Sequence, residues 1–337
     1  MIINSTCFFT SFNRAYSAQA LLWLDSIRNY YSDSVDVCAL LIDGLTRAER
    51  AIVSGFDEVL HVEDLGIDNF DNWIYRLNIV EAATAAKPFA LRELLNRYER
   101  VIYMDPDTYI YSGLHEIDSA LDDHSFVITP HQLIPNRTRW IVESTELQSL
   151  IYGVYNLGFL AVKSCDEGIA LADWWCERCY LYCISNPEKG LFTDQKFFDA
   201  APALFSEGLV LRHYGYNVAT WNVHERNISL RRNYAFIEED QLRFCHFTKA
   251  SNAGIPALER SAPSSNMFYE LFYSYVALLE EKRADTSLIR SKWDYSALPD
   301  GTIVDHDLRM KYRADFDKAI KNSESLANTL RIERSRS

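Results

Sequence analysis

The chain has 337 residues, of which 48 % are hydrophobic and 24 % charged, the balance of a globular protein able to bury a large core. Its formal net charge of −13 argues against nonspecific nucleic-acid binding, because such binding needs a cationic face. An anionic substrate stays open, since a divalent metal and a few Lys or Arg residues can neutralise a diphosphate inside an acidic protein.

The first hundred residues alternate predicted strands and helices. Strands are predicted over residues 2–9, 35–42, 58–62 and 100–104, and helices over residues 15–31, 46–54 and 84–98. Pro88 is placed in the first turn of the last helix, where a missing N–H costs little. The alternation indicates βαβ units, hence a mainly parallel sheet that binds ligands at the carboxyl ends of its strands.

The second half is less regular. Strands are predicted over residues 125–129, 154–162, 209–211, 228–230 and 242–247, and helices over residues 166–185, 193–200 and 266–283. No linker rich in Pro, Gly or Ser divides the chain. We therefore predict one α/β domain with a C-terminal extension and a frayed polar tail.

Cys176, Cys179 and Cys183 stand at spacings of three and four within the predicted helix 166–185. These spacings place them on one helical face, and Cys is a small, often buried residue. No second Cys or His pair of zinc spacing accompanies them. A buried stripe is therefore favoured over a metal site.

No run reaches the roughly 18 apolar residues of a membrane span, and no secretory signal is recognisable at the N-terminus. We expect a cytoplasmic protein, in which the N-x-S/T triplets are chance matches because glycosylation needs the secretory route. These triplets begin at Asn4, Asn136 and Asn227. The basic tail residues Arg331, Arg334 and Arg336 are the part expected to touch the inner face of a membrane.

The strongest motif is Asp105-Pro106-Asp107, directly after the predicted strand 100–104. In extended geometry, residues i and i+2 point the same way, so two carboxylates would converge beyond the strand end. Hard oxygen donors of this kind suit Mg²⁺ or Mn²⁺ shared with phosphate oxygens.

Two other interpretations of this motif exist. One is a turn at the strand end that begins with Asp-Pro. The other is a phosphatase of the haloacid-dehalogenase type, in which one Asp is the nucleophile and the second Asp is the general acid. That family has Thr or Val where this chain has Tyr109, and its motif usually lies near the start of the chain. The phosphatase interpretation is therefore disfavoured.

The motif belongs to an ordered set that resembles bacterial glycosyltransferases of the GT-A fold, related to glycogenin and the lipopolysaccharide galactosyltransferases. The pieces, in order, are Lys87-Pro88-Phe89, Asp105-Pro106-Asp107, Thr129-Pro130-His131, Tyr155-Asn156-Leu157-Gly158, Thr193-Asp194-Gln195, residues 216–226, Cys245-His246-Phe247 and Leu298-Pro299-Asp300-Gly301. The resemblance implies a Rossmann-like mixed, mainly parallel sheet flanked by helices. It implies a catalytic domain over 1–265, with a nucleotide half of about 1–110 and an acceptor half of about 111–265. A helical extension over 266–337 follows.

The resemblance also implies where the donor binds. His246 would complete a metal site with Asp105 and Asp107, a ligand set that favours Mn²⁺ somewhat over Mg²⁺. The alternative for His246 is a strand-end His bonded to backbone. The expected nucleotide contacts are Thr10, Phe12, Tyr16, Asp43, Lys87, Pro106 and Lys249. For Lys87 the alternative is a solvated lysine. No G-x-G-x-x-G is present, so a dinucleotide cofactor is not expected.

Asp194, Gln195 and Asn156 are the implied catalytic residues, with Asp194 near the sugar hydroxyls and the anomeric carbon. Thr193 is expected to cap the helix that follows it. Gly158 interrupts an apolar strand, where glycine permits close approach of another group. The remaining candidates for the acceptor or diphosphate site are His131, Asn217, Trp221, His224 and Arg226.

The predicted function is transfer of a sugar from a nucleoside diphosphate sugar, with UDP-sugar as the expected donor. The acceptor would be a hydroxyl of a glycan, a lipid-linked glycan or a protein, in glycan or polysaccharide biosynthesis. The resemblance favours retention of configuration. A nucleotidyltransferase that makes sugar nucleotides and a non-catalytic protein that binds them are the alternatives.

Overall fold

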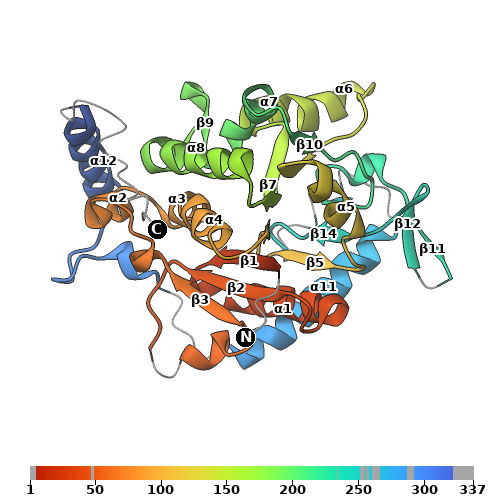
Figure 1. The fold of residues 1–337 in the computed structure, drawn as a ribbon, viewed down its shortest axis with the longest axis horizontal. Coiled ribbons are helices and arrows are strands. Elements are labelled where there is room, and N and C mark those ends of the chain that lie inside the picture. The colour runs from red at the N-terminus through yellow and green to blue at the C-terminus, as the bar shows by residue number, and fades with distance from the viewer. Residues whose placement is uncertain are drawn as a thin grey trace.

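The computed structural model describes residues 5–46, 49–232, 234–250, 255, 258–259, 266–286 and 292–321. A seven-stranded sheet runs through the molecule in the order β10-β6-β7-β4-β1-β2-β3 (Figure 1). Its strands are β1 (Thr6–Phe12), β2 (Asp36–Leu41), β3 (Glu58–His61), β4 (Arg100–Met104), β6 (Phe126–Pro130), β7 (Tyr155–Lys163) and β10 (Gly208–Val210). β7 is antiparallel to both of its neighbours, and the other pairs are parallel. The predicted mixed, mainly parallel sheet is confirmed.

Alternating residues of the central strands supply two separate cores. Cys7 and Phe9 of β1 pack on one face of the sheet, whereas Phe8 and Phe12 pack on the other. The first face is covered by α2 (Phe70–Tyr75), α3 (Ile79–Ala85), α4 (Lys87–Leu95) and α8 (Asp166–Tyr182), and the second by α1 (Ser17–Tyr31) and α5 (His115–Asp123). Both faces are apolar, which explains why these strands read as nearly continuous hydrophobic runs.

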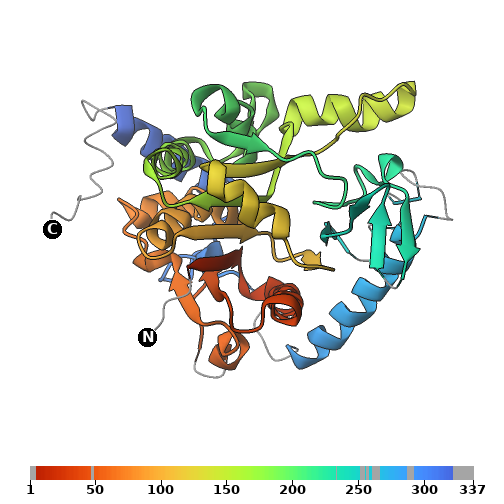
Figure 2. The same cartoon turned by 45° about the vertical axis from the view of Figure 1, so that its right-hand side comes forward.

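Several short strands and helices lie outside the seven-stranded sheet. β5 (Thr108–Ile110) pairs with β14 (Phe244–His246), β8 (Ser185–Asn186) with β9 (Leu191–Phe192), and β11 (Ile228–Arg231), β12 (Tyr234–Ile237) and β13 (Asp240–Gln241) form a small antiparallel sheet. The short helices α6 (Arg139–Ile141), α7 (Leu147–Tyr152) and α9 (Ala201–Leu204) lie between these strands. Figure 2 shows the β11–β12 hairpin and α11 on the same side of the molecule.

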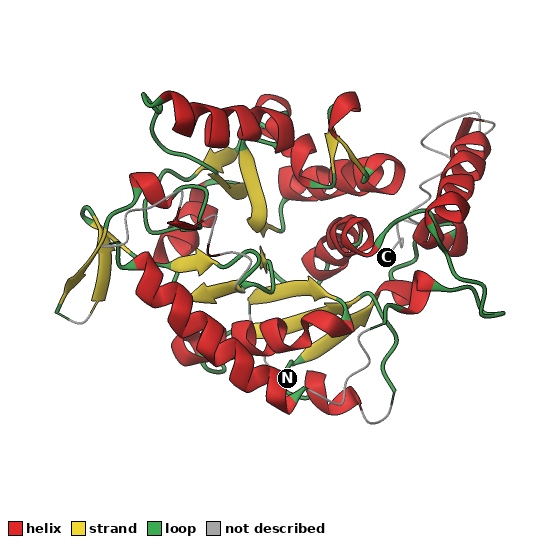
Figure 3. Cartoon of the chain, turned by 180° about the vertical axis from the view of Figure 1, so that it is seen from behind, coloured by secondary structure: helices red, strands yellow, loops and turns green. Residues whose placement is uncertain are grey.

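The predicted C-terminal helical extension is present and docks on the sheet domain. α11 (Phe268–Asp285) packs against α1 through an apolar cluster that includes Leu22 and Phe272. Seen from behind, these helices cross the sheet (Figure 3). α12 (His306–Lys321) packs beside α2 and adds Phe316 to the core. The predicted frayed tail, with Arg331, Arg334 and Arg336, lies outside the described residues, as does Asn4.

Several predicted elements differ from the observed ones. The predicted helix 84–98 is two helices, because Asn78 and Glu81 form a capping box that starts α3, and Pro88 stands in the first turn of a new helix α4. The predicted helix 46–54 is a 3₁₀ turn over Glu49–Val53. The first strand runs three residues further than predicted, to Phe12. α2, α5, β5 and α12 were not predicted.

Thr193 is not a helix cap. Its φ of 46° lies in the left-handed region, and the 3₁₀ turn that follows, Gln195–Asp199, is preceded by Asp194. The short predicted helix 193–200 is this turn, continued by α9. None of the helices among the described residues is long and apolar enough to cross a bilayer.

Candidate metal and nucleotide site

Asp105 and Asp107 lie in the turn between β4 and β5. The Asp105 backbone N–H donates to the Gly158 carbonyl at 2.9 Å, and the Thr108 hydroxyl donates to the Asp105 carbonyl at 2.8 Å. The two carboxylates thus converge because the backbone turns, and not because both belong to an extended strand as predicted. This turn lies at the carboxyl end of β4, the edge at which parallel sheets bind ligands.

His246 reaches the same place from the other half of the chain. It ends β14, where it stands opposite Thr108 in the antiparallel β5–β14 pair. Its Nε2 lies 3.0 Å from Asp107 Oδ1 and 3.7 Å from Asp105 Oδ2. Within the described residues, these three side chains form a group whose ligand atoms all lie within 4.8 Å of one another. Two carboxylates and a buried imidazole fit Mn²⁺ or Mg²⁺ in donor type and spacing.

Electrostatics at this group depend on the partners of each side chain. Burial acts to raise the pKa of Asp105, but Lys87, His246 and the Tyr103 hydroxyl together hold it below its ordinary value. Burial acts to lower the pKa of His246, and Asp107 and Asp105 outweigh it, so the net shift is upward. The lowered pKa of Asp105 thus reflects its cationic and hydrogen-bonding partners, whereas the raised pKa of His246 reflects the two carboxylates beside its ring.

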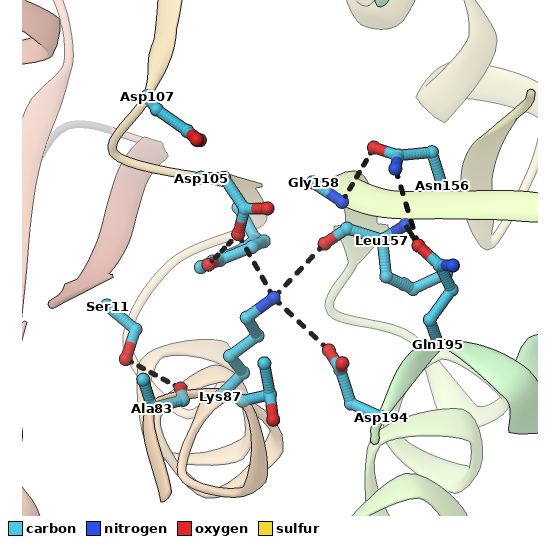
Figure 4. A network of polar contacts seen from close by, with 12 residues as sticks. Ser11, Ala83, Lys87, Asp105, Asp107, Asn156, Leu157, Gly158, Asp194 and Gln195 are labelled. Atoms are coloured by element: carbon cyan, nitrogen blue, oxygen red, sulfur yellow. Dashed lines mark hydrogen bonds and ion pairs between the residues drawn. The ribbon is translucent and has the colours of Figure 1, made fainter. Parts of the chain in front are cut away.

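Lys87 is a buried cation that joins two parts of the site (Figure 4). Its Nζ lies 3.1 Å from Asp105 Oδ1, 3.2 Å from Asp194 Oδ2 and 3.3 Å from the Leu157 carbonyl. Burial acts to lower its pKa, but the two carboxylates raise it above the ordinary lysine value. The solvated alternative for Lys87 is therefore wrong, because the side chain is 4 % exposed and its three hydrogens face three acceptors.

Tyr103 was missed by the sequence analysis. Its hydroxyl donates to Asp105 Oδ1, and its ring lies 4.4 Å from Lys87 Nζ. A signal for it exists in the sequence, since Tyr103 stands two residues before Asp105 and so projects from the same face of β4.

Asp194, Gln195 and Asn156 lie on the opposite side of the Lys87 ammonium from the Asp105 and Asp107 carboxylates (Figure 4). Asp194 is 2 % exposed, and burial raises its pKa although Lys87 opposes this shift. Gln195 Oε1 accepts from the Leu157 N–H at 3.2 Å and from Asn156 Nδ2 at 3.3 Å. The three predicted catalytic residues are thus held next to one another.

Gly158 makes room for the metal group. A Cβ at this position would lie 2.4 Å from His246 Cε1 and 2.7 Å from Asn156 Oδ1. Such distances are far below van der Waals contact, so the imidazole packs directly against the backbone of β7. The prediction that this glycine permits close approach of another group agrees with the structure, which shows the group to be His246.

A cavity of about 190 Å³ opens beside the carboxylates. The wall is formed by the first βα turn, α3, the start of α4 and the Asp105–Asp107 turn. These segments contribute Phe12, Asn13, Tyr16, Val80, Lys87 and Pro106, among others. Tyr16 is 45 % exposed, which leaves its ring available to a ligand. Thr10 is fully buried and does not line this cavity. The first βα turn therefore lies beside the predicted metal site, as expected for a nucleotide contact.

A second cavity, of about 280 Å³, shares Tyr16 and Asp107 with the first. Lys249 lines it together with Tyr275 and Arg283. The expected diphosphate contact Lys249 therefore shares a cavity with one of the metal-site carboxylates.

Asp43 contacts the C-terminal segment 292–296 and does not line the cavity. Its carboxylate accepts from the Arg14 N–H at 2.8 Å and from the Asp294 N–H at 3.0 Å, and its side chain is fully buried. Trp293 Nε1 also donates to the Ile42 carbonyl at 3.2 Å. In this structure Asp43 ties residues 292–296 to the end of β2, instead of presenting an oxygen to ribose or base.

The acceptor candidates fall into two groups. Trp221 has its ring edge-on to His131 at 5.6 Å and to His246 at 5.1 Å, so it contacts both imidazoles. His131 Nε2 faces Asn156 Nδ2 at 3.2 Å, and burial lowers the pKa of His131 to about 4. These two residues thus contact the site through His246 and Asn156.

Arg226 and His224 are bound elsewhere. The Arg226 guanidinium is 1 % exposed and donates to the Tyr214 and Tyr216 carbonyls. The His224 imidazole bonds to Asn136 at 2.9 Å. The structure therefore does not bring the Arg226 charge to the carboxylates, and its role is to hold the loop that carries Asn217 and Trp221.

The three helical cysteines are buried, and their thiols pack within the core beneath the sheet. Burial raises the pKa values of Cys176 and Cys179 well above the ordinary thiol value. The predicted buried stripe is confirmed.

No protein-family model matches the chain. Over 167 residues it is 30 % identical to the uncharacterized protein YfnF of Bacillus subtilis (strain 168), a match that covers 48 % of this chain and 54 % of YfnF. It is 23 % identical to YfnD of the same organism over 167 residues, covering 48 % and 51 %. The chain thus spans about half the length of the curated relatives it matches.

Among solved structures, the galactosyltransferase LgtC in complex with donor and acceptor sugar analogues is similar at a TM-score of 0.48 and 15 % identity, over 83 % of this chain and 99 % of LgtC. The glycosyltransferase GlyE of Streptococcus pneumoniae TIGR4 is similar at a TM-score of 0.44 and 13 % identity, over 85 % of this chain and 64 % of GlyE. Both of these solved structures are glycosyltransferases.

Proposed function

We propose that this protein is a metal-dependent glycosyltransferase that moves a sugar from a nucleoside diphosphate sugar, expected to be a UDP-sugar, to a hydroxyl acceptor. The observation that carries the proposal is the convergence of Asp105, Asp107 and His246 beside a cavity walled by the first βα turn. Residues 1–265 would form the catalytic domain, with its nucleotide half over about 1–110 and its acceptor half over about 111–265. Residues 266–337 would extend it.

Bound Mn²⁺ or Mg²⁺ would act as a Lewis acid toward the departing diphosphate. Asp105, Asp107 and His246 would hold it, and Lys87 keeps Asp105 ionised and in place. Tyr16 would stack on the base, and Lys249 would contact the diphosphate. The site would therefore hold opposite charges in fixed positions before the sugar–phosphate bond breaks, which is how preorganised charge lowers a barrier.

Retention of configuration is the outcome that the position of Asp194 supports. An inverting enzyme needs a carboxylate base beside the acceptor hydroxyl. Asp194 is 2 % exposed and lies 3.2 Å from the Lys87 ammonium, so it is poorly placed to take a proton from an acceptor. In a retaining reaction the leaving diphosphate can accept that proton, while Asn156 and Gln195 shield the opposite face of the sugar.

The test is release of nucleoside diphosphate from a panel of nucleotide sugars with Mn²⁺, with glycan hydroxyls as acceptors. Asp105→Ala and Asp107→Ala are expected to abolish release while the protein stays folded, and excess EDTA is expected to do the same. Asp122→Asn is the control, because Asp122 forms an exposed ion pair with Arg100 far from the cavity wall. Full activity in either alanine variant, or in EDTA, would refute the metal assignment.

The same samples distinguish the two alternative functions. A nucleotidyltransferase would release pyrophosphate from a nucleoside triphosphate and a sugar phosphate. A protein that only binds nucleotide sugars would bind UDP-sugar with Mn²⁺ but release no UDP.

A further inference from the structure

A chain of buried amides runs from the backbone of β7 to the imidazole of His246. Its first link is Asn156, whose Oδ1 lies 3.0 Å from the Gly158 N–H. A backbone N–H can only donate, so the Asn156 atom that faces it must be the oxygen. The backbone N–H therefore fixes which end of the Asn156 amide is the oxygen and which is the nitrogen.

Asn217 is the second link. The atom that lies 2.9 Å from Asn156 Oδ1 must be a donor, hence Nδ2, and the same nitrogen faces Thr129 Oγ1 at 3.0 Å. The other end of the Asn217 amide is then its oxygen, which lies 3.3 Å from His246 Nδ1. An amide oxygen only accepts, so Nδ1 of His246 must carry a proton.

In the neutral imidazole that a metal requires, a proton on Nδ1 leaves Nε2 with the lone pair. Nε2 is the nitrogen that faces the carboxylates, 3.0 Å from Asp107 Oδ1. A metal needs a neutral imidazole with a free lone pair, and a hydrogen bond at the other ring nitrogen fixes both the tautomer and the ring plane. Resting on the metal site of the proposed function, we propose that Asn217 is a positioning residue that fixes the His246 tautomer for metal binding through Nε2.

The backbone at Asn217 suits this role. Its φ of 53° is in the left-handed region, which Asn tolerates better than most residues. The side chain is 1 % exposed, so water does not compete for its amide. Asn217→Gly removes the amide and keeps the left-handed conformation without strain, since glycine adopts it freely.

Asn222 offers a matched control in the same loop. Its buried amide donates to the His131 carbonyl at 3.1 Å and to the Asn217 carbonyl at 3.0 Å, and accepts from the Ala219 N–H at 2.9 Å. None of these bonds involves His246. Asn222→Ala therefore removes buried amide hydrogen bonds from the same loop but keeps the Asn217 amide that accepts from His246 Nδ1.

Mn²⁺ binding to the full chain, measured by calorimetry without nucleotide, gives the first readout. Asn217→Gly is expected to weaken Mn²⁺ binding about tenfold to a hundredfold, the usual effect of losing an outer partner of a metal-binding His. Asn222→Ala is expected to bind Mn²⁺ like the wild type. Wild-type affinity in Asn217→Gly, or an equal loss in both variants, would overturn the proposal.

Nitrogen NMR of the ¹⁵N-histidine-labelled, Mg²⁺-saturated wild type gives a second readout, with His246→Gln used to identify the resonances. The proton is expected on Nδ1 of His246, and a proton on Nε2 would overturn the proposal. If the wild type binds no Mn²⁺, the proposed function fails. If the wild type binds Mn²⁺ and Asn217→Gly binds it equally well, only the role of Asn217 is refuted.

Discussion

Replacing Gly158 by alanine tests how closely the metal group depends on packing. The added Cβ would lie 2.4 Å from His246 Cε1 and 2.7 Å from His246 Nδ1. The imidazole cannot simply swing away, because Asn217 holds Nδ1 and the carboxylates face Nε2. We therefore expect the ring to be pushed off its position, with loss of the geometry that a metal requires.

The magnitude follows from two opposing effects. Overpacking of a well-packed interior costs about 1–3 kcal/mol, whereas Gly→Ala lowers the entropy of the unfolded chain and returns about 0.4–1 kcal/mol. Gly158→Ala should therefore lose up to about 2.6 kcal/mol of unfolding free energy in urea. Displacing a metal ligand should also weaken Mn²⁺ binding about tenfold or more.

Gly44→Ala provides the control. A Cβ at Gly44 would meet Asp294 Oδ2 at 3.4 Å, which is ordinary contact. We expect this variant to keep both its unfolding free energy and its Mn²⁺ affinity. A Gly158→Ala protein with unchanged urea midpoint and unchanged Mn²⁺ affinity would show that His246 has room to move, and the packing explanation would be wrong.

Three further predictions concern charge. Lys87→Met leaves Asp105 and Asp194 without their shared cation and should cost about 3–5 kcal/mol of unfolding free energy near neutral pH. This loss should shrink in acid, because Asp194 then takes up a proton. An unchanged urea midpoint would contradict the prediction. The His131 pKa of about 4 is below its unfolded value of about 6.5, so the unfolded state binds more protons between these pH values. The unfolding free energy should therefore fall by up to about 3 kcal/mol as the pH is lowered through this range. His131→Gln should reduce this dependence of the unfolding free energy on pH. Mn²⁺ at about 100 times its Kd should add about 2.7 kcal/mol to the unfolding free energy, which a thermal melt would show as a higher Tm. EDTA should reverse this stabilisation, and Asp107→Ala should not show it.

The sequence predicted those parts of the site that depend on residues close to one another in the chain. Residues 100–104 are one buried strand, so the position of Asp105 and Asp107 at a sheet edge follows from periodicity alone. The approach of His246 depends instead on the pairing of β5 with β14, which joins residues more than a hundred positions apart. The ordered motifs suggested that approach, but no local pattern specifies the register.

The roles of three charged residues could not be predicted because the sequence does not show which partner each side chain meets. Lys87 turns inward since α4 packs between β4 and α8, and this burial brings it to Asp194. Asp43 binds the backbone of Asp294, 251 residues away. The Arg226 guanidinium donates hydrogen bonds to carbonyls of its own loop. A sequence shows that such side chains are charged, but the fold decides which charge meets which partner.

Anomalous scattering at the manganese edge, from crystals grown with Mn²⁺ and UDP, tests the central claim most directly. The proposed site predicts a strong peak within coordination distance of Asp105, Asp107 and His246, with the UDP diphosphate bound to the same ion and the nucleoside in the cavity beside Tyr16. UDP bound with no manganese at these three residues, or manganese and UDP bound at separate places, would contradict it.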